Sequence, residues 1–257
     1  MFWKRSSVEH IKPYDLLAKI YDHVMRHVDY VEWADYAEQV FTHFGPVPRH
    51  IVEVACGTGT LAVKLAQRGY SVHGIDASEA MIVQARAKAA AIGNGAPTFS
   101  VGDMRDLPPD DADAVLCLYD SVNYCLTEDD LRSALSSFRR TVHAEALCLF
   151  DVTTEANSLR YFRSYRCREK HEGFVCKRHS RYLQEERLQL NEFVIEQPGS
   201  PEAVRELHEQ RIYALTDVLA AVSPQEWIVL GAFSDYTLDP ADEDAERIHI
   251  VLRARVT

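Results

Sequence analysis

Short apolar runs alternate with amphipathic stretches over the first 155 residues. Five apolar runs have the length and composition of buried strands: 51–55, 71–76, 98–101, 112–119 and 146–152. Between them, apolar residues recur with helical spacing over 58–68, over 78–92 and after 127. Ser78 and Thr127 are placed to cap the last two helices. Strands and helices in alternation predict a parallel sheet covered by helices on both faces.

The pattern differs on either side of this region. Residues 13–44 repeat apolar positions with helical spacing in two blocks, which predicts two helices, the second of which ends at Gly45-Pro46. After residue 155, long charged stretches alternate polar and apolar positions and predict antiparallel strands with one wet face: 174–183, 187–197 and 203–213. A short helix at 215–222 precedes two strands, at 227–236 and 247–256, that would complete the main sheet as a hairpin.

These elements predict an α/β fold with a doubly wound, mostly parallel, seven-stranded sheet and helices on both faces. Residues 1–155 and 214–257 would form the main domain, with a helical cap over 1–45. Residues 156–213 would form an inserted antiparallel lid, because there the apolar runs give way to charged alternation.

Composition and charge exclude several classes of protein. The chain of 257 residues is 47% hydrophobic and 26% charged, which is typical of a folded globular protein. Its net charge of -11 disfavours a nucleic-acid partner, since phosphate backbones require surplus Lys and Arg. No segment has the length of a membrane span or of a signal peptide, so we expect a cytoplasmic protein. The six cysteines lack the spacing of a zinc site, and we expect small buried thiols and no metal.

One segment departs from the acidic balance. Residues 160–181 contain eight Lys or Arg and two acids, a local surplus of 8 - 2 = +6. Such a cluster is suited to an anionic acceptor, a phosphate or RNA, but the solvated outer face of lid strands has the same composition. We favour the second interpretation.

The stretch "IVEVACGTGTLAVKLAQRGYSVHGID" joins the first two strands through a small-residue loop. Glycines let a ligand approach the backbone, and the following helix N-terminus offers free N–H groups. Asp76, at the end of the second strand, can accept hydrogen bonds from ribose hydroxyls. This pattern also fits the dinucleotide motif G-x-G-x-x-A, so the loop by itself leaves the nucleotide open.

Four further features decide between the alternatives. Glu53 lies inside the first strand, where burying an acid is costly unless it serves the loop or a ligand. About 50 residues precede this strand, whereas dinucleotide domains often begin with it. "GDMRDLP" and "LYDSVNY" place polar groups after the third and fourth strands, at the edge of the sheet where ligands bind.

Taken together, these motifs resemble class I S-adenosylmethionine-dependent methyltransferases with a Rossmann-like sheet. The chain is most similar to small bacterial enzymes that act on small molecules, including sugar-amine and glycine/sarcosine-type N-methyltransferases. "YDHVM", "DSVNYCLTEDDLRSAL" and "HEQRIY" contribute to the likeness, which covers most of the chain. The resemblance implies S-adenosylmethionine as cofactor and a small-molecule methyl acceptor. It does not distinguish a monomer from a homodimer.

The resemblance also assigns roles to individual residues. Those implied to bind the cofactor are Tyr14, Tyr21, Glu53, Ala55, Cys56, Gly57, Gly59, Asp76, Ala77, Met81, Asp103, Met104 and Leu118. Within this set, Asp76 would hold the ribose, Asp103 the adenine amino group, and the two tyrosines of the N-terminal helix would cover the sulfonium. Ala55 replaces a frequent glycine, and Glu53 a more frequent Asp. The tyrosines and methionines are also consistent with simple packing.

The acceptor would lie beyond the fourth strand. Tyr21, Asp120 and His208 are the candidates for a catalytic base, and Asn123, Tyr124 and Arg211 for substrate contacts. Asn123 in a turn and His208 on a lid strand are equally consistent with structural roles. We therefore expect an enzyme that methylates a small molecule, most simply on nitrogen. The alternatives are a non-catalytic cofactor-binding or regulatory module, an RNA methyltransferase that docks through 160–181, and a dinucleotide-dependent oxidoreductase.

Overall fold

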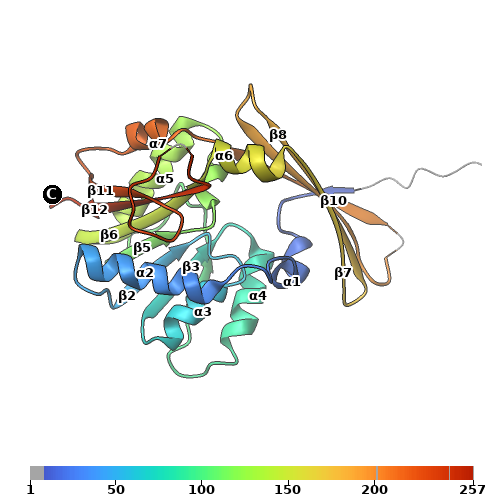
Figure 1. Cartoon of the computed structure of the whole chain (residues 1–257). Helices are drawn as coiled ribbons and strands as arrows, with labels where there is room; N and C mark the ends of the chain where they lie inside the picture. Colours follow the sequence, from blue (N-terminus) through green and yellow to red (C-terminus); the bar gives the residue numbers. More distant parts are fainter. Residues whose placement is uncertain (1–8, 201, 243, 257) are drawn as a thin grey trace, which may run out of the picture.

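The computed structural model describes residues 9–200, 202–242 and 244–256, whose strands form two sheets (Figure 1). The main sheet has seven strands in the order β11-β12-β6-β5-β2-β3-β4. Their bounds are β2 His50–Val54, β3 Ser71–Asp76, β4 Thr98–Val101, β5 Ala112–Cys117, β6 Val142–Thr153, β11 Trp227–Ser234 and β12 Arg247–Ala254. β2 to β6 pair in parallel, and β12 is antiparallel to both of its neighbours. This confirms the predicted α/β class and the mostly parallel seven-stranded sheet.

Helices cover both faces of the main sheet (Figure 1). One face packs against α2 (Tyr30–Phe44), α3 (Thr60–Gln67) and α4 (Glu79–Ala89). The other packs against α5 (Glu128–Arg140) and α7 (Leu215–Ala221). The chain winds outward from β2 through β3 and β4, and then restarts on the opposite side with β5 and β6. The reversal between β2 and β5 is where open α/β sheets bind ligands.

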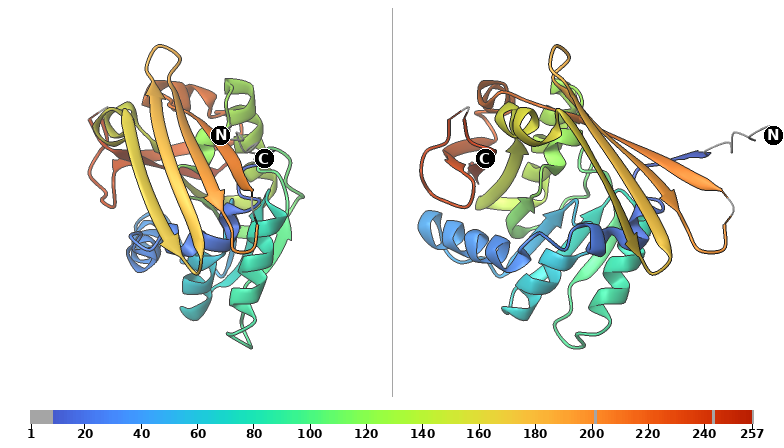
Figure 2. Two further views of the ribbon diagram at one scale, coloured as in Figure 1. Left: turned by 90° about the vertical axis from the view of Figure 1, so that its right-hand side faces the viewer. Right: turned by 45° about the vertical axis from the view of Figure 1, so that its right-hand side comes forward.

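The second sheet stands beside the carboxyl ends of the main strands (Figure 2). Its order is β1-β10-β9-β8-β7, with bounds β1 Glu9–Ile11, β7 Ser164–His171, β8 Phe174–Leu183, β9 Leu188–Glu196 and β10 Ala203–Arg211. A short helix, α6 (Glu155–Asn157), and a π-helical turn (Ser158–Phe162) connect it to β6. β8, β9 and β10 coincide with the predicted charged strands. β1 and β7 are not predicted, since they are short or largely exposed and bury little apolar surface. Within the described residues, no helix is long and apolar enough to cross a membrane.

The N-terminal segment differs from the two-helix prediction. A 3-10 turn (Leu17–Ile20) and the four-residue α1 (Tyr21–Val24) replace the first helix, and α2 follows. Tyr14 lies in a turn with a φ of 67° and not on a helix, which corrects its predicted placement. The apolar spacing at Leu16, Leu17 and Ile20 instead serves packing against the second sheet. Residues 1–8 of the predicted cap over 1–45 lie outside the described residues.

Glu206 of β10 holds the N-terminal segment to the second sheet. Its carboxylate is fully buried and accepts backbone N–H groups from Tyr14 at 2.7 Å, Leu16 at 2.7 Å and Leu17 at 2.9 Å. Hydrogen bonds to a buried charge are stronger than neutral ones, and each of these donors would otherwise lack a partner. One side chain therefore sets the path of the segment that crosses in front of the main sheet.

We predict that Glu206→Gln loosens this segment, since an amide oxygen without charge cannot replace two carboxylate oxygens. Loss of a charged hydrogen bond should lower the free energy of unfolding by about 1.5–3 kcal/mol. Urea denaturation measures this cost, and hydrogen exchange should show faster exchange at residues 14–17. Glu209→Gln, at an exposed position of the same strand, is the matched control. Equal exchange rates in the two variants would contradict the role of Glu206.

Candidate active site

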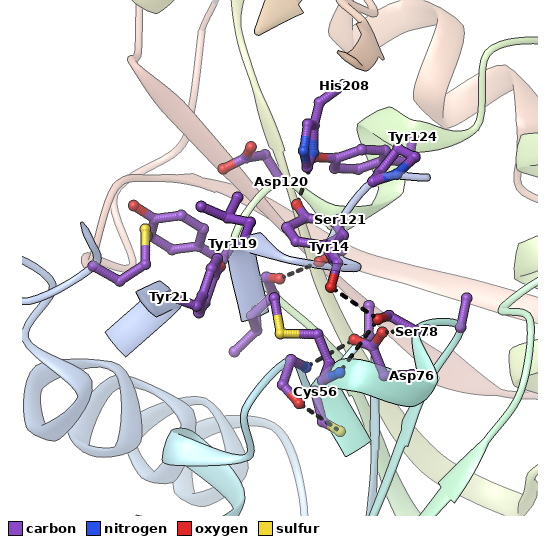
Figure 3. A pocket seen from close by; sticks show the side chains of 18 of the residues that line it. Tyr14, Tyr21, Cys56, Asp76, Ser78, Tyr119, Asp120, Ser121, Tyr124 and His208 are labelled. Carbon is purple, nitrogen blue, oxygen red and sulfur yellow. Dashed lines mark hydrogen bonds between the residues drawn. The ribbon is translucent and has the colours of Figure 1, made fainter. Parts of the chain in front are cut away.

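A cavity of about 770 Å³ lies at the carboxyl ends of the main strands. The N-terminal segment and the second sheet form its remaining walls (Figure 3). Fifteen of the predicted site residues line it: Tyr14, Tyr21, Glu53, Ala55, Cys56, Gly57, Asp76, Ala77, Met81, Asp103, Met104, Leu118, Asp120, Tyr124 and His208. The cavity thus has one part beside the loop after β2 and another beneath the second sheet.

The loop after β2 contains three residues in the left-handed backbone conformation. Ala55, Gly57 and Gly59 have φ values of 54°, 55° and 71°. A Cβ on Gly59 would lie 2.6 Å from the ring of Phe99, so this position packs the loop and does not line the cavity. Ala55 adopts this backbone with a Cβ, which costs roughly 1–2 kcal/mol. The loop delivers the N-terminus of α3 to the cavity.

Asp76 is fixed by the loops on either side of it (Figure 3). One carboxylate oxygen accepts the N–H of Gly57 at 2.8 Å, and the other accepts that of Ser78 at 2.8 Å. Burial raises the pKa of this carboxyl, although both backbone N–H groups oppose the shift. Each oxygen keeps a lone pair for a further donor, such as a hydroxyl.

Glu53 presents an unusual buried carboxyl to the cavity. Its Oε2 atom lacks a hydrogen-bond partner within the described residues, and burial raises the pKa of the group to about 8. Backbone hydrogen bonding to Ala62 opposes this shift but does not offset it. An unpaired buried polar atom is costly, so its retention beside the loop points to a ligand that supplies the missing partner.

Other predicted cofactor residues differ in exposure. Met81 is buried with 1% of its surface exposed, and Leu118 with 6%, so both form apolar floor. Asp103 is partly exposed and binds the Arg105 guanidinium at 2.6 Å, which lowers the pKa of its carboxyl. A second contact of Asp103 with a ligand would therefore compete with this ion pair.

Beneath the second sheet, four side chains form a continuous hydrogen-bonded chain. The hydroxyls of Tyr14 and Tyr124 are 2.5 Å apart, and that of Tyr124 is 3.0 Å from Nδ1 of His208. Nε2 of His208 is 3.3 Å from Glu206. Burial lowers the pKa of His208 despite the nearby carboxylate, so the neutral ring donates from Nε2 and accepts at Nδ1.

The Asp120 carboxylate is held by two strands, β12 and β10. Its carboxylate accepts from Arg247 of β12 at 2.7 Å and from Gln210 of β10 at 2.5 Å. Burial raises the pKa of Asp120, against the attraction of Arg247. Arg247 also binds the buried Asp151 at 2.8 Å and lies over the rings of Trp33 and Tyr119. Both oxygens of Asp120 are thus engaged, as suits a group that positions others.

The structure corrects two predicted substrate contacts. Asn123 is buried away from the cavity and bonds the backbone of Thr153 and Arg211, so it joins loops. The Arg211 side chain turns outward and donates to the carbonyl of Glu186 at 2.7 Å. The odd and even positions of β10 face opposite ways, and Arg211 is on the outer face while His208 and Gln210 are on the inner one.

Several lining residues are missing from the sequence prediction. Among them are Arg247 of β12 and several polar or aromatic residues of the second sheet and its connections: Phe162, Arg178, Gln189, Asn191, Phe193 and Gln210. Gln189, Asn191 and Phe193 occupy alternate positions of β9, so their spacing marks one face. The signal is weak, because alternation does not indicate which face is buried when both carry polar residues.

Comparison with known proteins shows that this chain is similar to methyltransferases. Residues 51–145 match the family model described as a methyltransferase domain. A 142-residue segment is 35% identical to YqeM of Bacillus subtilis (strain 168), which is named as a methyltransferase, and covers 54% of this chain and 55% of that protein. The chain therefore spans about half the length of this relative. A Geobacillus sp. (strain WCH70) protein, also named as a methyltransferase, is 27% identical over 93% of this chain and 99% of its own length.

Solved structures share the whole fold. An S-adenosylmethionine-dependent methyltransferase from Clostridium acetobutylicum ATCC 824 matches with a TM-score of 0.78 and 21% identity over 95% of this chain and 99% of that one. The sugar N-methyltransferase KedS8 from Streptoalloteichus sp ATCC 53650 matches with a TM-score of 0.74 and 19% identity, over 100% of this chain and 97% of that one. At these identities the likeness establishes the fold.

The buried carboxyl of Glu53 generates a pH prediction. With a folded-state pKa of about 8, the folded chain keeps a proton that the unfolded chain releases above about pH 4.3. Ionisation of Glu53 therefore does not reduce the free energy of unfolding below about pH 4.3, and it reduces this free energy progressively as pH rises to about 8. We expect Glu53→Gln to remove this loss, so that the stability difference between variant and wild type increases over that range.

Urea denaturation of the ligand-free protein from pH 4 to pH 9 measures the difference. Glu209→Gln, at an exposed position, controls for the change of net charge. A difference between Glu53→Gln and wild type that stays constant across the range would show that Glu53 is not buried as a neutral acid.

Proposed function

Because residues 51–145 match a methyltransferase domain, we propose that this chain transfers a methyl group from S-adenosylmethionine to a small molecule, on nitrogen. The cavity beneath the second sheet supports this proposal, since it is bounded by side chains on several sides and has the volume of a small-ligand site. The similarity to KedS8, a sugar N-methyltransferase, favours a nitrogen acceptor. The net charge of -11 favours a small molecule over nucleic acid.

The loop side of the cavity suits the cofactor. S-adenosylmethionine would supply a methyl group on a sulfonium, and the neutral thioether of S-adenosylhomocysteine would be a good leaving group. Asp76 offers two positioned acceptor oxygens for ribose hydroxyls, and the glycines of the loop leave room beside the backbone. The unpartnered Oε2 of Glu53 is the observation that best supports a polar ligand at this place.

Positioning and exclusion of water are the main tasks left to the protein. Tyr14 and Tyr21 come from the N-terminal segment, with ring centroids 5.9 Å apart in an edge-on arrangement. They would orient the acceptor and shield the reacting atoms from solvent. Holding two groups in reactive geometry lowers the barrier by as much as about 7–11 kcal/mol.

An amine acceptor must lose its proton before it attacks, and the Tyr14-Tyr124-His208 chain provides the route. Burial raises the pKa of both phenols, so they stay neutral and can pass a proton along their hydroxyls. The neutral His208 would take that proton at Nδ1, and the carboxylate of Glu206 would stabilise the resulting cation. His208 and Tyr21 remain our candidate base and positioning group, while Asp120 holds Gln210 in place.

Turnover of small amines tests the proposed function. Pools of amines, amino acids and amino sugars are supplied with S-adenosylmethionine, and release of S-adenosylhomocysteine is measured. Wild type should methylate at least one pool. Asp76→Ala, which removes the ribose acceptor, should weaken cofactor binding by calorimetry about tenfold or more.

Asp106→Ala is the matched control, because Asp106 is exposed and lies outside the cavity lining. Methylation of total RNA while every small-molecule pool stays unmodified would overturn the proposed acceptor class. Unchanged cofactor affinity in Asp76→Ala would overturn the proposed ribose contact.

A pH profile tests the proton route. Burial holds the pKa of His208 below its usual value near 6.5, so the ring accepts a proton above that pKa and becomes charged below it. We expect His208→Gln to lower kcat/KM on the order of 10². The ratio of wild-type to variant kcat/KM should rise with pH to a plateau reached by about pH 6.5. Ionisation of the acceptor amine cancels in this ratio, so a ratio close to 1 from pH 5 to pH 9 would exclude His208 from the route.

A further inference from the structure

Arg178 is distinguished from the other cations of the basic segment 160–181. The remaining members are exposed: Arg160, Arg163, Arg166, Arg168, Lys170, Lys177 and Arg181. Arg178 is half-buried and lines the cavity. It shares the inner face of β8 with Cys176 and Ser180, which are two residues away on either side. One cation of the segment thus lines the part of the cavity beneath the second sheet.

The guanidinium of Arg178 is held in place without a carboxylate. Its Nε donates to the hydroxyl of Ser180 at 2.9 Å, and Nη2 donates to the side-chain oxygen of Asn191 at 2.8 Å. The rings of Phe162, Phe193 and Tyr165 lie 5.0, 5.4 and 5.6 Å from its central carbon. Among the described residues, no Asp or Glu oxygen is within ion-pair distance of it. Three of its five N–H donors are therefore uncommitted.

The polar side chains next to Arg178 form hydrogen bonds with one another. Asn191 and Gln189 both donate to the side-chain oxygen of Gln210, at 3.1 and 3.2 Å. Gln210 in turn donates to Asp120, which is neutralised by Arg247. These bonds fix the orientation of the wall, and Arg178 lies at its far end without an ion pair to either carboxylate of this group, Asp120 or Asp151.

We propose that Arg178 binds an anionic group of the methyl acceptor, a carboxylate or a phosphate. A planar guanidinium fixed by aromatic rings presents its free edge donors in the arrangement that two oxygens of such a group require. Partial burial strengthens this attraction relative to one in bulk water. The chemistry of the acceptor is then a nucleophilic nitrogen with an acidic group nearby. This inference rests on the proposed function and specifies its substrate class.

Matched acceptor pairs test it in the wild-type protein. The pairs are methylamine and glycine, ethanolamine and O-phosphoethanolamine, and glucosamine and glucosamine 6-phosphate. In at least one pair, we expect the member that carries a carboxylate or phosphate to have the higher kcat/KM, on the order of tenfold or more. Arg178→Gln should reduce that value to the level of the member without an acidic group. An equal or lower kcat/KM for the acidic member in every pair that reacts would overturn the proposal.

Binding of inorganic phosphate separates this inference from the proposed function. In calorimetry on protein saturated with S-adenosylhomocysteine, wild type and Arg181→Gln should bind phosphate, and Arg178→Gln should bind it at least about tenfold more weakly. Arg181 is three residues further along β8 and exposed, so it controls for charge. Equal phosphate affinity in wild type and Arg178→Gln overturns the proposal even if no acceptor reacts. If Arg178→Gln fails to fold, Arg178→Lys takes its place, with weaker two-oxygen binding expected and unchanged affinity counting against the proposal.

Discussion

The buried carboxylate of Glu206 is the interaction on which the walls of the cavity depend. It accepts three backbone N–H groups of the N-terminal segment and faces Nε2 of His208. Burial would raise the pKa of this carboxyl, but the bonds from His208 and the backbone outweigh burial and lower it. A group held ionised by four donors is fixed in direction, and it fixes the tautomer of His208 in turn. The path of the backbone and the orientation of the candidate base therefore have a common origin.

A second constraint is the cost of placing so many polar groups out of water. The inner face of the second sheet carries Gln189, Asn191 and Gln210, which bond to one another and to Asp120. Arg247 forms ion pairs with both Asp120 and Asp151 behind them. Networks of this kind are stable only when each member has a partner, and they then leave little freedom of orientation. Two exceptions among the described residues that line the cavity are Oε2 of Glu53 and the free edge of Arg178, and a ligand could supply the missing partners there.

The sequence predicts what periodicity and local chemistry determine. Strands β3 and β4 have their predicted bounds, and Thr127 caps α5 by accepting the N–H of Asp130, since these features depend on neighbouring residues alone. The turn at Tyr14 could not be predicted, because its partner Glu206 is 192 residues away. For the same reason Asn123 and Arg211 are misassigned. Asn123 lies in the turn after β5, and Arg211 is the last residue of β10. Both elements border the cavity, and only tertiary contacts decide which way each side chain turns.

The separation between Glu206 and the N-terminal segment has a consequence for biosynthesis. The backbone of Leu16 finds its acceptor 190 residues further along the chain, so it leaves the ribosome long before that acceptor exists. At ordinary translation rates of roughly 5–20 residues per second, the delay is about 10–40 s. For most of that interval Leu16, Leu17 and Ile20 lack their packing partners Cys176, Phe193 and Ile195, which are synthesised late. The nascent chain therefore carries an exposed apolar segment that a chaperone can occupy, and the backbone of this segment docks on Glu206 only after β10 has emerged.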